Sequence, residues 1–432
     1  MWNIMKNVFL LLLLLLVSSV STGQKLSKKE KQILQEVESL HGEALQFLEK
    51  VVNMNSGTLN FEGVRETGRV FQQAFNEIGF STQWIDMPEA VNRAGHLFTE
   101  HKGDKGKKLL LIGHLDTVFD KDSPFQKWEQ QDTIAYGPGA NDMKGGNVVM
   151  LYALKALYNR GLLDGAQVIV ALHGDEESAG KPITISRRDI IEAAKRSDIA
   201  LGFETSTGFN YATVARRGSS GWQLEVQGRQ AHSSVIFNER VGAGAVFEAS
   251  RILYQFYDQL SAEELLTFNP GTIAGGTRVE VNDENSTMNA YGKSNIVAQH
   301  VVVKGGLRFI SEEQKEKARE NMRKIVAEHL PHTSATITFT DSYPAMPPTE
   351  GNMALLRQLN QLSLDLGQGE VQAFDPGRRG AADISFIAQY VDGLDGLGTM
   401  GGGAHAPNEY MDLRTFKALI QRTALFMYRL TR

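Results

Sequence analysis

The sequence predicts an α/β fold in which a mostly parallel central sheet, with helices on both faces, is interrupted by an inserted ferredoxin-like α+β domain. A βαβ pattern supports this prediction, because apolar strands at residues 108–113 and 167–173 flank a helical segment at 145–158. A β-α-β-β-α-β order then follows between residues 220 and 340. After a proline-rich stretch near residue 345, the alternation of helices and strands resumes.

The individual elements follow from the spacing of apolar residues. Residues 26–52 and 61–78 have apolar side chains at helical spacing and are predicted to form amphipathic helices ahead of a first strand at 80–86. In the inserted domain we expect strands at 220–227, 272–281, 296–309 and 335–340, and helices at 242–258 and 312–329. The last expected elements are helices at 352–366, 381–390 and 413–430 and a strand at 394–399. The predicted organisation is one α/β domain, residues 24–216 and 345–432, split by an inserted domain at 217–344.

The composition of the 432-residue chain excludes several classes of protein. The chain has no cysteine, so thiolate nucleophiles, disulfide redox centres, iron–sulfur clusters and cysteine zinc fingers are ruled out, and any metal must be held by histidine and carboxylate. Lys and Arg number 45 against 50 Asp and Glu, and the net charge of −5 gives no indication of nucleic-acid binding. The 42 glycines exceed the usual share of about 7% and indicate tight functional turns. A small or peptide-like partner is expected.

Residues 1–23 have the layout of a secretory signal peptide. Lys6 precedes an unbroken apolar run from Val8 to Val17, and small residues follow up to Gly23. The apolar run is too short to span a bilayer stably. We therefore expect an exported protein, periplasmic or secreted, that begins near Gln24 and has no membrane span after cleavage; a buried N-terminal helix is the alternative.

The first candidate metal ligand follows the predicted strand at 108–113. In the segment GHLDTV, His114 and Asp116 are alternate residues that can face the same side, so that His114 binds a metal while Asp116 orients its imidazole. A surface histidine is the alternative for this short motif alone. In GPGANDMKGG, glycines surround Asp142 without the spacing of a GxxxxGK[ST] or GxGxxG phosphate loop. We interpret this segment as a turn that presents one acid.

Three further segments add acids and a second histidine. Asp175, Glu176 and Glu177 end the predicted strand QVIVALH, where adjacent buried acids need neutralising cations or protons; a solvated acidic turn is the alternative. Glu204 ends another apolar strand, and His405 lies in a glycine-rich loop near the C-terminus. Open α/β sheets bind ligands at the carboxyl ends of their strands. Two histidines and three carboxylates suit a pair of zinc ions bridged by one carboxylate and a water.

Other catalytic designs lack their sequence signatures. The chain contains neither a GxSxG nucleophile elbow nor an HExxH helix, which argues against a serine hydrolase and a zincin. His173 precedes the acidic triplet and is interpreted as a supporting or core residue. The histidines expected to face solvent are His41, His96, His101, His300, His329 and His332.

The motifs GHLDTV, GPGANDMKGG, HGDEES, GFETS and GGGAHAPNEY, in this order, resemble those of the di-zinc metallopeptidase family that includes glutamate carboxypeptidase, aminoacylase and acetylornithine deacetylase. The resemblance is closest to the glutamate carboxypeptidase branch, which has Glu at the GFE position. It implies a di-zinc exopeptidase fold, two Zn²⁺ per subunit, and a lid and dimerisation domain at 217–344. The implied metal ligands are His114 and Glu204 for one zinc, Glu177 and His405 for the other, and Asp142 as the bridge; Asp116 steadies His114, and Glu176 is the general base.

Three residues of the inserted domain also match family positions. His232 in GRQAHSS resembles the lid histidine that reaches into the partner subunit's active site and stabilises the oxyanion, which implies a homodimer formed through the lid. Asn295 and Arg308 resemble residues that contact the oxyanion region and the terminal carboxylate of the substrate. A guanidinium suits a carboxylate because it can bond both oxygens at once. An exposed loop histidine and a surface ion pair are the alternatives for His232 and Arg308.

The chain departs from the family pattern at two places. In GRRGAAD, Arg378 and Arg379 stand where the family's carboxypeptidases usually carry a glycine run, and they either add a second anionic subsite or lie on the surface. Ala406 stands where the family often has serine after the ligand histidine, a change that removes no metal ligand. Both departures concern specificity rather than the chemistry of hydrolysis.

The leading functional hypothesis is an exported zinc-dependent carboxypeptidase that hydrolyses an amide bond next to a free C-terminal carboxylate. Glu176 would take the proton of the bridging water as the hydroxide attacks the scissile carbonyl. An N-acyl-amino-acid deacylase or a dipeptidase with the same metal centre is the alternative, and a non-catalytic binding protein on this fold is a further one. The expected substrate is a small peptide or acyl-amino acid, and other divalent metals can take the place of zinc.

Overall fold

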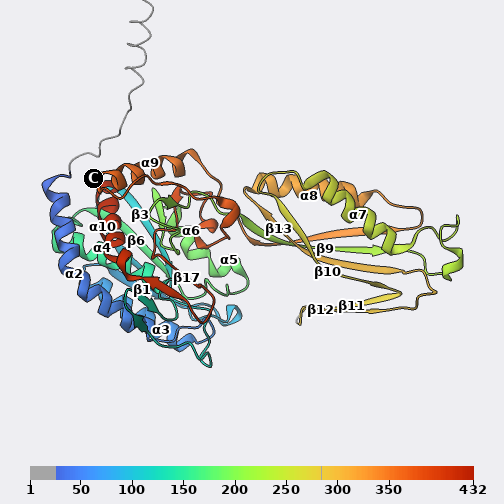
Figure 1. Cartoon of the computed structure of the whole chain (residues 1–432), viewed down its shortest axis with the longest axis horizontal. Helices are drawn as coiled ribbons and strands as arrows, with labels where there is room; N and C mark the ends of the chain where they lie inside the picture. The colour runs from blue at the N-terminus through green and yellow to red at the C-terminus, as the bar shows by residue number, and fades with distance from the viewer. Residues whose placement is uncertain (1–25, 284) are drawn as a thin grey trace, which may run out of the picture.

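The computed structural model describes residues 26–283 and 285–432, and the predicted signal peptide lies outside this range. Both ends of the described chain form an α/β domain, and the middle forms a lid domain that extends to one side of it (Figure 1). Within the described residues, no helix is long and apolar enough to cross a membrane.

A six-stranded sheet forms the centre of the α/β domain, in the order β1-β2-β6-β3-β7-β16. Its last four strands are parallel to one another, whereas the first two join antiparallel at one edge. The predicted mostly parallel sheet is therefore confirmed. The strands are β1 (Ser81–Ile85), β2 (His96–His101), β3 (Lys105–His114), β6 (Ala166–His173), β7 (Ile199–Gly202) and β16 (Gly393–Leu394).

Helices cover both faces of this sheet, as predicted. Leu109 and Leu111 of β3 belong to the large apolar core that includes α2, α4 and α10. Leu110 and Ile112 point to the opposite face and pack in a smaller core with Ile190 of α6, since successive side chains of a strand alternate. The helices of this domain are α2 (Lys28–Val52), α3 (Phe61–Glu77), α4 (Lys144–Asn159), α5 (Ile183–Ser186), α6 (Arg188–Ala194), α9 (Glu350–Asp365) and α10 (Leu413–Leu430).

The ends of these helices follow local side-chain chemistry. Ser27 and Glu30 form a capping box at the start of α2, and the Asp412 side chain accepts a hydrogen bond from the backbone of Arg414 at the start of α10. The α4 helix starts without a side-chain cap directly after the GPGAND turn. Asp142 of this turn lies two residues before the first residue of α4.

Smaller sheets shape the loops around the site. The four-stranded sheet β17-β18-β5-β4 holds the C-terminal glycine-rich loop, and β8 pairs in parallel with β15 beside the loop that contains the two arginines. The strands are β4 (Glu129–Gln131), β5 (Ile134–Tyr136), β8 (Tyr211–Ala212), β15 (Gln372–Ala373), β17 (Gly401–Gly402) and β18 (Tyr410–Asp412).

The lid domain has the predicted ferredoxin-like order β9-α7-β10-β13-α8-β14. Its antiparallel sheet runs β10-β13-β9-β14, so the two edge strands follow the two helices. Trp222 and Leu224 of β9 pack in one core with Phe256 of α7 and Met322 of α8. The lid elements are β9 (Gly218–Gln227), α7 (Gly244–Leu260), β10 (Thr267–Gly276), β11 (Arg278–Asn282), β12 (Thr287–Tyr291), β13 (His300–Phe309), α8 (Glu312–Ala327) and β14 (Ser334–Tyr343).

Several predicted elements differ from the structure. Residues 381–390 contain only the 3₁₀ turn η4 (Asp383–Phe386), because Asp383 is drawn into a buried ion cluster described below. The strand expected at 394–399 is reduced to β16, since Asp395 turns to pair with Arg216. The strand expected at 272–281 is divided between β10 and β11, and neither the hairpin β11–β12 nor strand β2, which lies between β1 and β6, was predicted. In these places tertiary contacts outweigh the local apolar pattern.

Candidate metal centre

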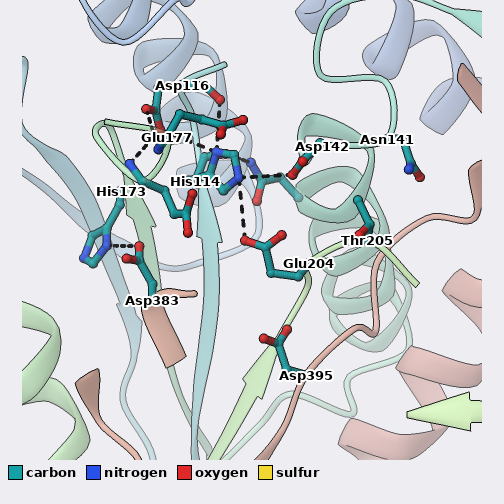
Figure 2. Close-up of polar contacts among 12 residues, drawn as sticks. His114, Asp116, Asn141, Asp142, His173, Glu177, Glu204, Thr205, Asp383 and Asp395 are labelled. Carbon is teal, nitrogen blue, oxygen red and sulfur yellow. Dashed lines mark hydrogen bonds and ion pairs between the residues drawn. The ribbon is translucent and has the colours of Figure 1, made fainter. Parts of the chain in front are cut away.

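The predicted metal ligands converge at the carboxyl edge of the central sheet. His114 ends β3, Glu177 follows β6, and Glu204 follows β7. Asp142 lies just before α4, and His405 lies in the loop between β17 and β18. Figure 2 shows the imidazole of His114 with contacts to both Asp142 and Glu204. This is the edge at which open α/β sheets bind their ligands.

The five side chains form two groups that share Asp142. In the first group, Nε2 of His114 lies 3.5 Å from Oδ1 of Asp142 and 3.6 Å from Oε1 of Glu204. In the second, Nε2 of His405 lies 3.4 Å from Oδ2 of Asp142 and 3.0 Å from Oε2 of Glu177. Asp142 thus presents one carboxylate oxygen to each group, as a bridging ligand must.

The spacing of these atoms fits metal ions better than hydrogen bonds. Tetrahedral zinc ligands at their usual distances from the metal lie about 3.4 Å from one another. The three contacts of His114 and His405 at 3.4–3.6 Å agree with that value and exceed the length of a good hydrogen bond. Nε2 of His114 is buried and has no hydrogen-bond partner within the described part of the chain, a group that a metal would satisfy. The residues therefore fit a pair of divalent cations.

The electrostatics of the cluster agree with this fit. Burial, and then the charge of Asp142, raises the pKa of Glu204 to about 8. Burial also raises the pKa of Glu177, although the hydrogen bond from His405 opposes this shift. The adjacent carboxylates of Asp142 and Glu177 raise the pKa of His405 to about 11. In the protein alone, protons compensate the crowded carboxylates, and bound cations would replace those protons.

Asp116 connects the histidine loop to the acidic turn. Nδ1 of His114 lies 3.0 Å from the carbonyl oxygen of Asp116, a contact that places the proton on Nδ1 and leaves Nε2 free for a metal. The carboxylate of Asp116 accepts hydrogen bonds from the backbone N–H groups of Glu176 at 3.0 Å and Glu177 at 3.1 Å. Thr58, which the sequence pattern did not indicate, donates to the same carboxylate at 2.6 Å. Asp116 therefore positions the acidic turn as well as the imidazole.

Two features that were not predicted hold Asp142 in place. The buried carboxylate of Glu409 accepts hydrogen bonds from the backbone N–H groups of Asn141 at 2.8 Å and Asp142 at 2.9 Å. Gly146 lets α4 approach β7, because a Cβ there would lie 2.1 Å from the carbonyl oxygen of Phe203, the neighbour of Glu204. The available sequence signal for Glu409 was an acid in the same glycine-rich loop as His405.

A buried ion cluster lies under the acidic turn. Arg187 is fully buried and donates hydrogen bonds to Asp175 at 2.5 Å and Asp383 at 2.7 Å. Asp383 also pairs with His173 (Figure 2), whose ring centroid lies 4.5 Å from that of His96. The prediction that His96 faces solvent is wrong, since β2 buries it completely. Burial, followed by the charge of His173, lowers the pKa of His96 to about 3, so this ring stays neutral in the cluster.

Replacing Arg187 with methionine is expected to destabilise the protein by about 3–5 kcal/mol, because two buried carboxylates would lose their shared cation. Chemical denaturation of the purified variant measures this loss. Arg188 is the matched control, since its side chain is exposed and it pairs only with Asp189 on the surface, so Arg188→Met should change stability by less than about 1 kcal/mol. Equal destabilisation by both variants would contradict a structural role of the cluster.

The three lid residues predicted to bind substrate lie in two separate places. Arg308 is exposed and pairs with Ser219 at the start of β9, where the chain enters the lid from the α/β domain. His232 and Asn295 line a cavity of about 420 Å³ in the loops that follow β9 and precede β13. The backbone N–H of Ser233 donates to the carbonyl oxygen of Asn295 at 2.9 Å and holds these loops together. These loops lie at the end of the lid remote from the α/β domain, so His232 and Asn295 are not beside the metal ligands of their own chain (Figure 1).

The α/β domain with its inserted ferredoxin-like lid thus carries two groups of potential metal ligands that share one aspartate. The model of peptidase family M20/M25/M40 matches residues 110–429, and the chain belongs to this family. The protein is therefore a peptidase-type metallohydrolase.

The chain is similar over most of its length to a curated relative, and in fold to solved peptidases. Over 410 residues the chain is 27% identical to carboxypeptidase G2 of Pseudomonas sp. (strain RS-16), covering 92% of both chains. Its fold is similar to that of aminopeptidase PepT from Bacillus cereus, with a TM-score of 0.72 and 16% identity over 91% of this chain and 99% of the other. It is also similar to the Bacillus subtilis YXEP protein, a dinuclear metal binding peptidase, with a TM-score of 0.62 and 16% identity over 91% and 99%.

Proposed function

We propose that this protein is a two-zinc carboxypeptidase that hydrolyses an amide bond next to a free C-terminal carboxylate. The observation that carries the proposal is the position of Asp142, which presents one oxygen to His114 and the other to His405. The similarity to carboxypeptidase G2 supports the carboxypeptidase activity. The exposed Arg308 at the base of the lid supports recognition of a carboxylate, since it forms no ion pair within the described residues.

Glu176 is the proposed general base. When bound, the zinc ions polarise the scissile carbonyl and lower the pKa of the attacking water. Glu176 takes the proton of that water as the new C–O bond forms, and returns it to the amine as the C–N bond breaks. In the protein without metal, burial, followed by the charge of Glu204, raises the pKa of Glu176 well above its usual range. The positive charge of bound cations would lower this pKa again and leave the carboxylate free to accept the proton.

The backbone of Glu176 is held between the two domains. Its N–H donates to Asp116 at 3.0 Å, and its carbonyl oxygen accepts a hydrogen bond from the hydroxyl of Tyr343 in β14 at 3.2 Å. Movement of the lid would therefore be transmitted to the general base through Tyr343.

We also propose a homodimer through the lid, in which His232 donates a hydrogen bond to the oxyanion in the active site of the other subunit. The backbone N–H of Ser234 donates to Nδ1 of His232 at 3.2 Å, which leaves the proton of the neutral ring on Nε2. A set of exposed apolar and aromatic side chains on the lid supports the dimer. Its residues, all at least one third exposed, are Phe237, Val246, Phe247, Tyr254, Tyr257 and Ile273 on α7 and neighbouring lid segments.

A mixture of two inactive variants tests this arrangement. Glu176→Gln removes the base and His232→Ala removes the oxyanion donor, so each homodimer is expected to be inactive. After exchange of subunits in equal amounts, half of the dimers are mixed and each has one complete site, so activity should return to about a quarter of the wild-type value. Steady-state rates of the mixture measure this recovery. A mixture that stays inactive although subunit exchange is demonstrated would show that His232 acts within its own chain.

A substrate panel separates the proposed carboxypeptidase from its alternatives. The metal-reconstituted protein is given N-acyl amino acids, dipeptides and longer peptides, each with a free or an amidated C-terminus. A carboxypeptidase releases the last residue of longer peptides and fails on the amides. Cleavage confined to short acyl groups would identify a deacylase, cleavage confined to dipeptides a dipeptidase, and no cleavage with metal bound a binding protein.

We further propose that the protein is exported, on the basis of the apolar run between Val8 and Val17 and the small residues up to Gly23. Determination of the N-terminal residue of the protein isolated from its cells tests this proposal. A mature N-terminus near Gln24 is expected, and an intact Met1 in the cell interior would contradict it.

A further inference from the structure

A cluster of lysines lies at one end of the α/β domain, and we call this cluster the basic pole. Three of its lysines are in the first turn of α2, and four lie between the end of β2 and the early part of β3. The residues of the basic pole are Lys28, Lys29, Lys31, Lys102, Lys105, Lys107 and Lys108. All of them are exposed except Lys108, which is half-buried.

Contacts at the end of α10 bring the two groups of lysines together. Arg429 donates a hydrogen bond to Glu30, in the first turn of α2, at 2.7 Å. Two residues further on, Thr431 packs on Gly106 of β3, where a Cβ would lie 2.3 Å from the Thr431 backbone. Figure 1 shows the start of α2 beside the C-terminus, at the side of the α/β domain that faces away from the lid. The lysines therefore form one surface rather than two.

The charge of the basic pole is not compensated within the described part of the chain. None of its lysines forms an ion pair there, whereas other lysines of the same domain pair with glutamates; these are Lys155, Lys195 and Lys417. Residues 28–31 and 102–108 contain only two acids, Glu30 and Asp104. Glu30 is already paired with Arg429. The pole is therefore a positive surface with free ammonium groups.

This surface has the opposite sign to the chain as a whole, whose net charge is −5. At physiological ionic strength, charges separated by more than about 8 Å are largely screened. An anionic surface that touches the pole therefore interacts with the lysines much more strongly than with the distant carboxylates. Such a surface would bind the protein in one orientation.

Two observations favour an anionic membrane surface as the partner. Residues 28–31 and 102–108 contain lysine and no arginine, and flexible point charges suit a diffuse layer of phosphate headgroups better than one fixed group. The second observation is the position of the preceding chain. The apolar run ends at Val17, nine residues before Leu26, and nine residues span at most about 32 Å. While that run is engaged in a membrane during export, the pole is held close to the headgroups.

Binding at the basic pole leaves the metal centre accessible. β3 begins at Lys105 of the pole and ends at His114 of the metal centre. At about 3.3 Å per residue, these two ends of the strand are about 30 Å apart. The lid lies on the side of the α/β domain remote from the pole (Figure 1). A protein that is bound through the pole can therefore still admit substrate and move its lid.

We propose that the basic pole is a docking surface for an anionic lipid membrane, which holds the protein at the membrane with its metal centre directed away from the lipid. The binding is peripheral and electrostatic, so it weakens as salt is added. Neither the metal ions nor the proposed carboxypeptidase activity enters this inference.

Co-sedimentation with lipid vesicles tests the proposal. The mature protein, residues 24–432, contains the whole described structure and is mixed with vesicles of phosphatidylcholine alone or with about 30% phosphatidylglycerol, at about 50 mM salt. We expect binding to the anionic vesicles to be at least about 10-fold tighter than to the neutral ones, and to be lost near 500 mM salt, where the Debye length is only about 4 Å.

Two triple variants remove the charge from either half of the pole. They are Lys28→Gln with Lys29→Gln and Lys31→Gln, and Lys102→Gln with Lys105→Gln and Lys107→Gln. A lysine at an anionic surface contributes up to about fivefold in affinity, so each triple variant should bind roughly 10- to 100-fold more weakly. Both variants should retain wild-type metal content and melting temperature, since these side chains are exposed.

A third triple variant, Lys50→Gln with Lys121→Gln and Lys127→Gln, is the matched control. These lysines are also exposed, but Lys50 lies in the last turn of α2 and the other two follow the far end of β3. The control changes the net charge by the same amount and should bind like the wild type. Acetylation of the wild-type protein, read by mass spectrometry, gives a measurement without variants. Anionic vesicles should slow acetylation at the pole and leave the three control lysines unaffected.

Several results would overturn this inference. They are equal binding to neutral and anionic vesicles, no binding to either at low salt, and an equal loss of binding in the control and the pole variants. Pole-dependent binding to a DNA duplex without binding to vesicles would identify a soluble polyanion as the partner instead. If the pole variants do not fold, the acetylation pattern decides, because uniform protection or none contradicts the proposal. Binding is measured without substrate, so its outcome is independent of the proposed peptidase activity.

Discussion

The Glu176→Gln variant is expected to lose roughly 10²- to 10⁴-fold in kcat while it retains two metal ions per chain. Glutamine has the shape of glutamate but cannot take a proton from water. Glu176 belongs to neither group of potential metal ligands, so metal binding should persist. Its backbone remains fixed by Asp116 and Tyr343, because neither hydrogen bond involves the side chain that is replaced. Steady-state kinetics together with metal analysis by mass spectrometry measure the two effects on one sample.

Glu313→Gln is the control for this variant, because Glu313 is exposed at the start of α8 on the lid and is remote from the sheet edge. It should match the wild type in both measurements. Wild-type turnover in Glu176→Gln would exclude Glu176 as the base. Loss of metal in that variant would instead make Glu176 a ligand.

The Asp142→Asn variant is expected to lose both metal ions and, with them, activity. The amide carries no negative charge and offers only one oxygen, whereas the aspartate presents one oxygen to His114 and one to His405. Without the shared carboxylate, each group retains only two of its three potential ligands. Metal content per chain and the rate of peptide hydrolysis measure the outcome.

His405→Ala separates the two groups, because it leaves His114, Asp142 and Glu204 together. This variant should retain about one metal ion per chain. Asp122→Asn, at an exposed carboxylate, controls for the change in charge and should retain two. An Asp142→Asn variant that binds two metals and turns over normally would contradict the bridging role.

The parts of the fold with strong local patterns could be predicted from the sequence. β3 is a continuous apolar run, and α10 has apolar residues at helical spacing, so both were predicted close to their observed bounds. The candidate ligands were found for a related reason. Each of His114, Glu177 and Glu204 follows an apolar strand, and parallel strands bring their carboxyl ends to one edge.

The remaining features depend on contacts between residues that are distant in the sequence. Arg187 and Asp383 form one buried pair although 196 positions separate them, and no local pattern marks either residue. Because that pair fixes residue 383, the helix expected at 381–390 does not form. The carboxylate of Glu409 is likewise recognised only when the GPGAND turn is folded against it. Local sequence thus indicated the candidate metal ligands and the candidate base, but not the residues that hold them in position.

The interpretation of the two adjacent arginines shows the same limit. The sequence does not distinguish the two residues. In the structure, Arg378 stacks on the ring of Phe374, whereas Arg379 turns toward Thr205 beside Glu204. The difference arises from the hydrogen bonds to the carbonyl oxygens of Gly377 and Gly380, which set the direction of each side chain. Only the folded loop shows that Arg378 lies on the surface and that Arg379 lies beside Glu204.

Anomalous X-ray scattering at the zinc edge, from crystals of the metal-reconstituted protein, tests the central claim most directly. The account predicts two zinc peaks per chain, one between His114 and Glu204 and the other between Glu177 and His405, with a carboxylate oxygen of Asp142 bound to each. A single peak, or peaks held by other residues while these five side chains stay free, would contradict it.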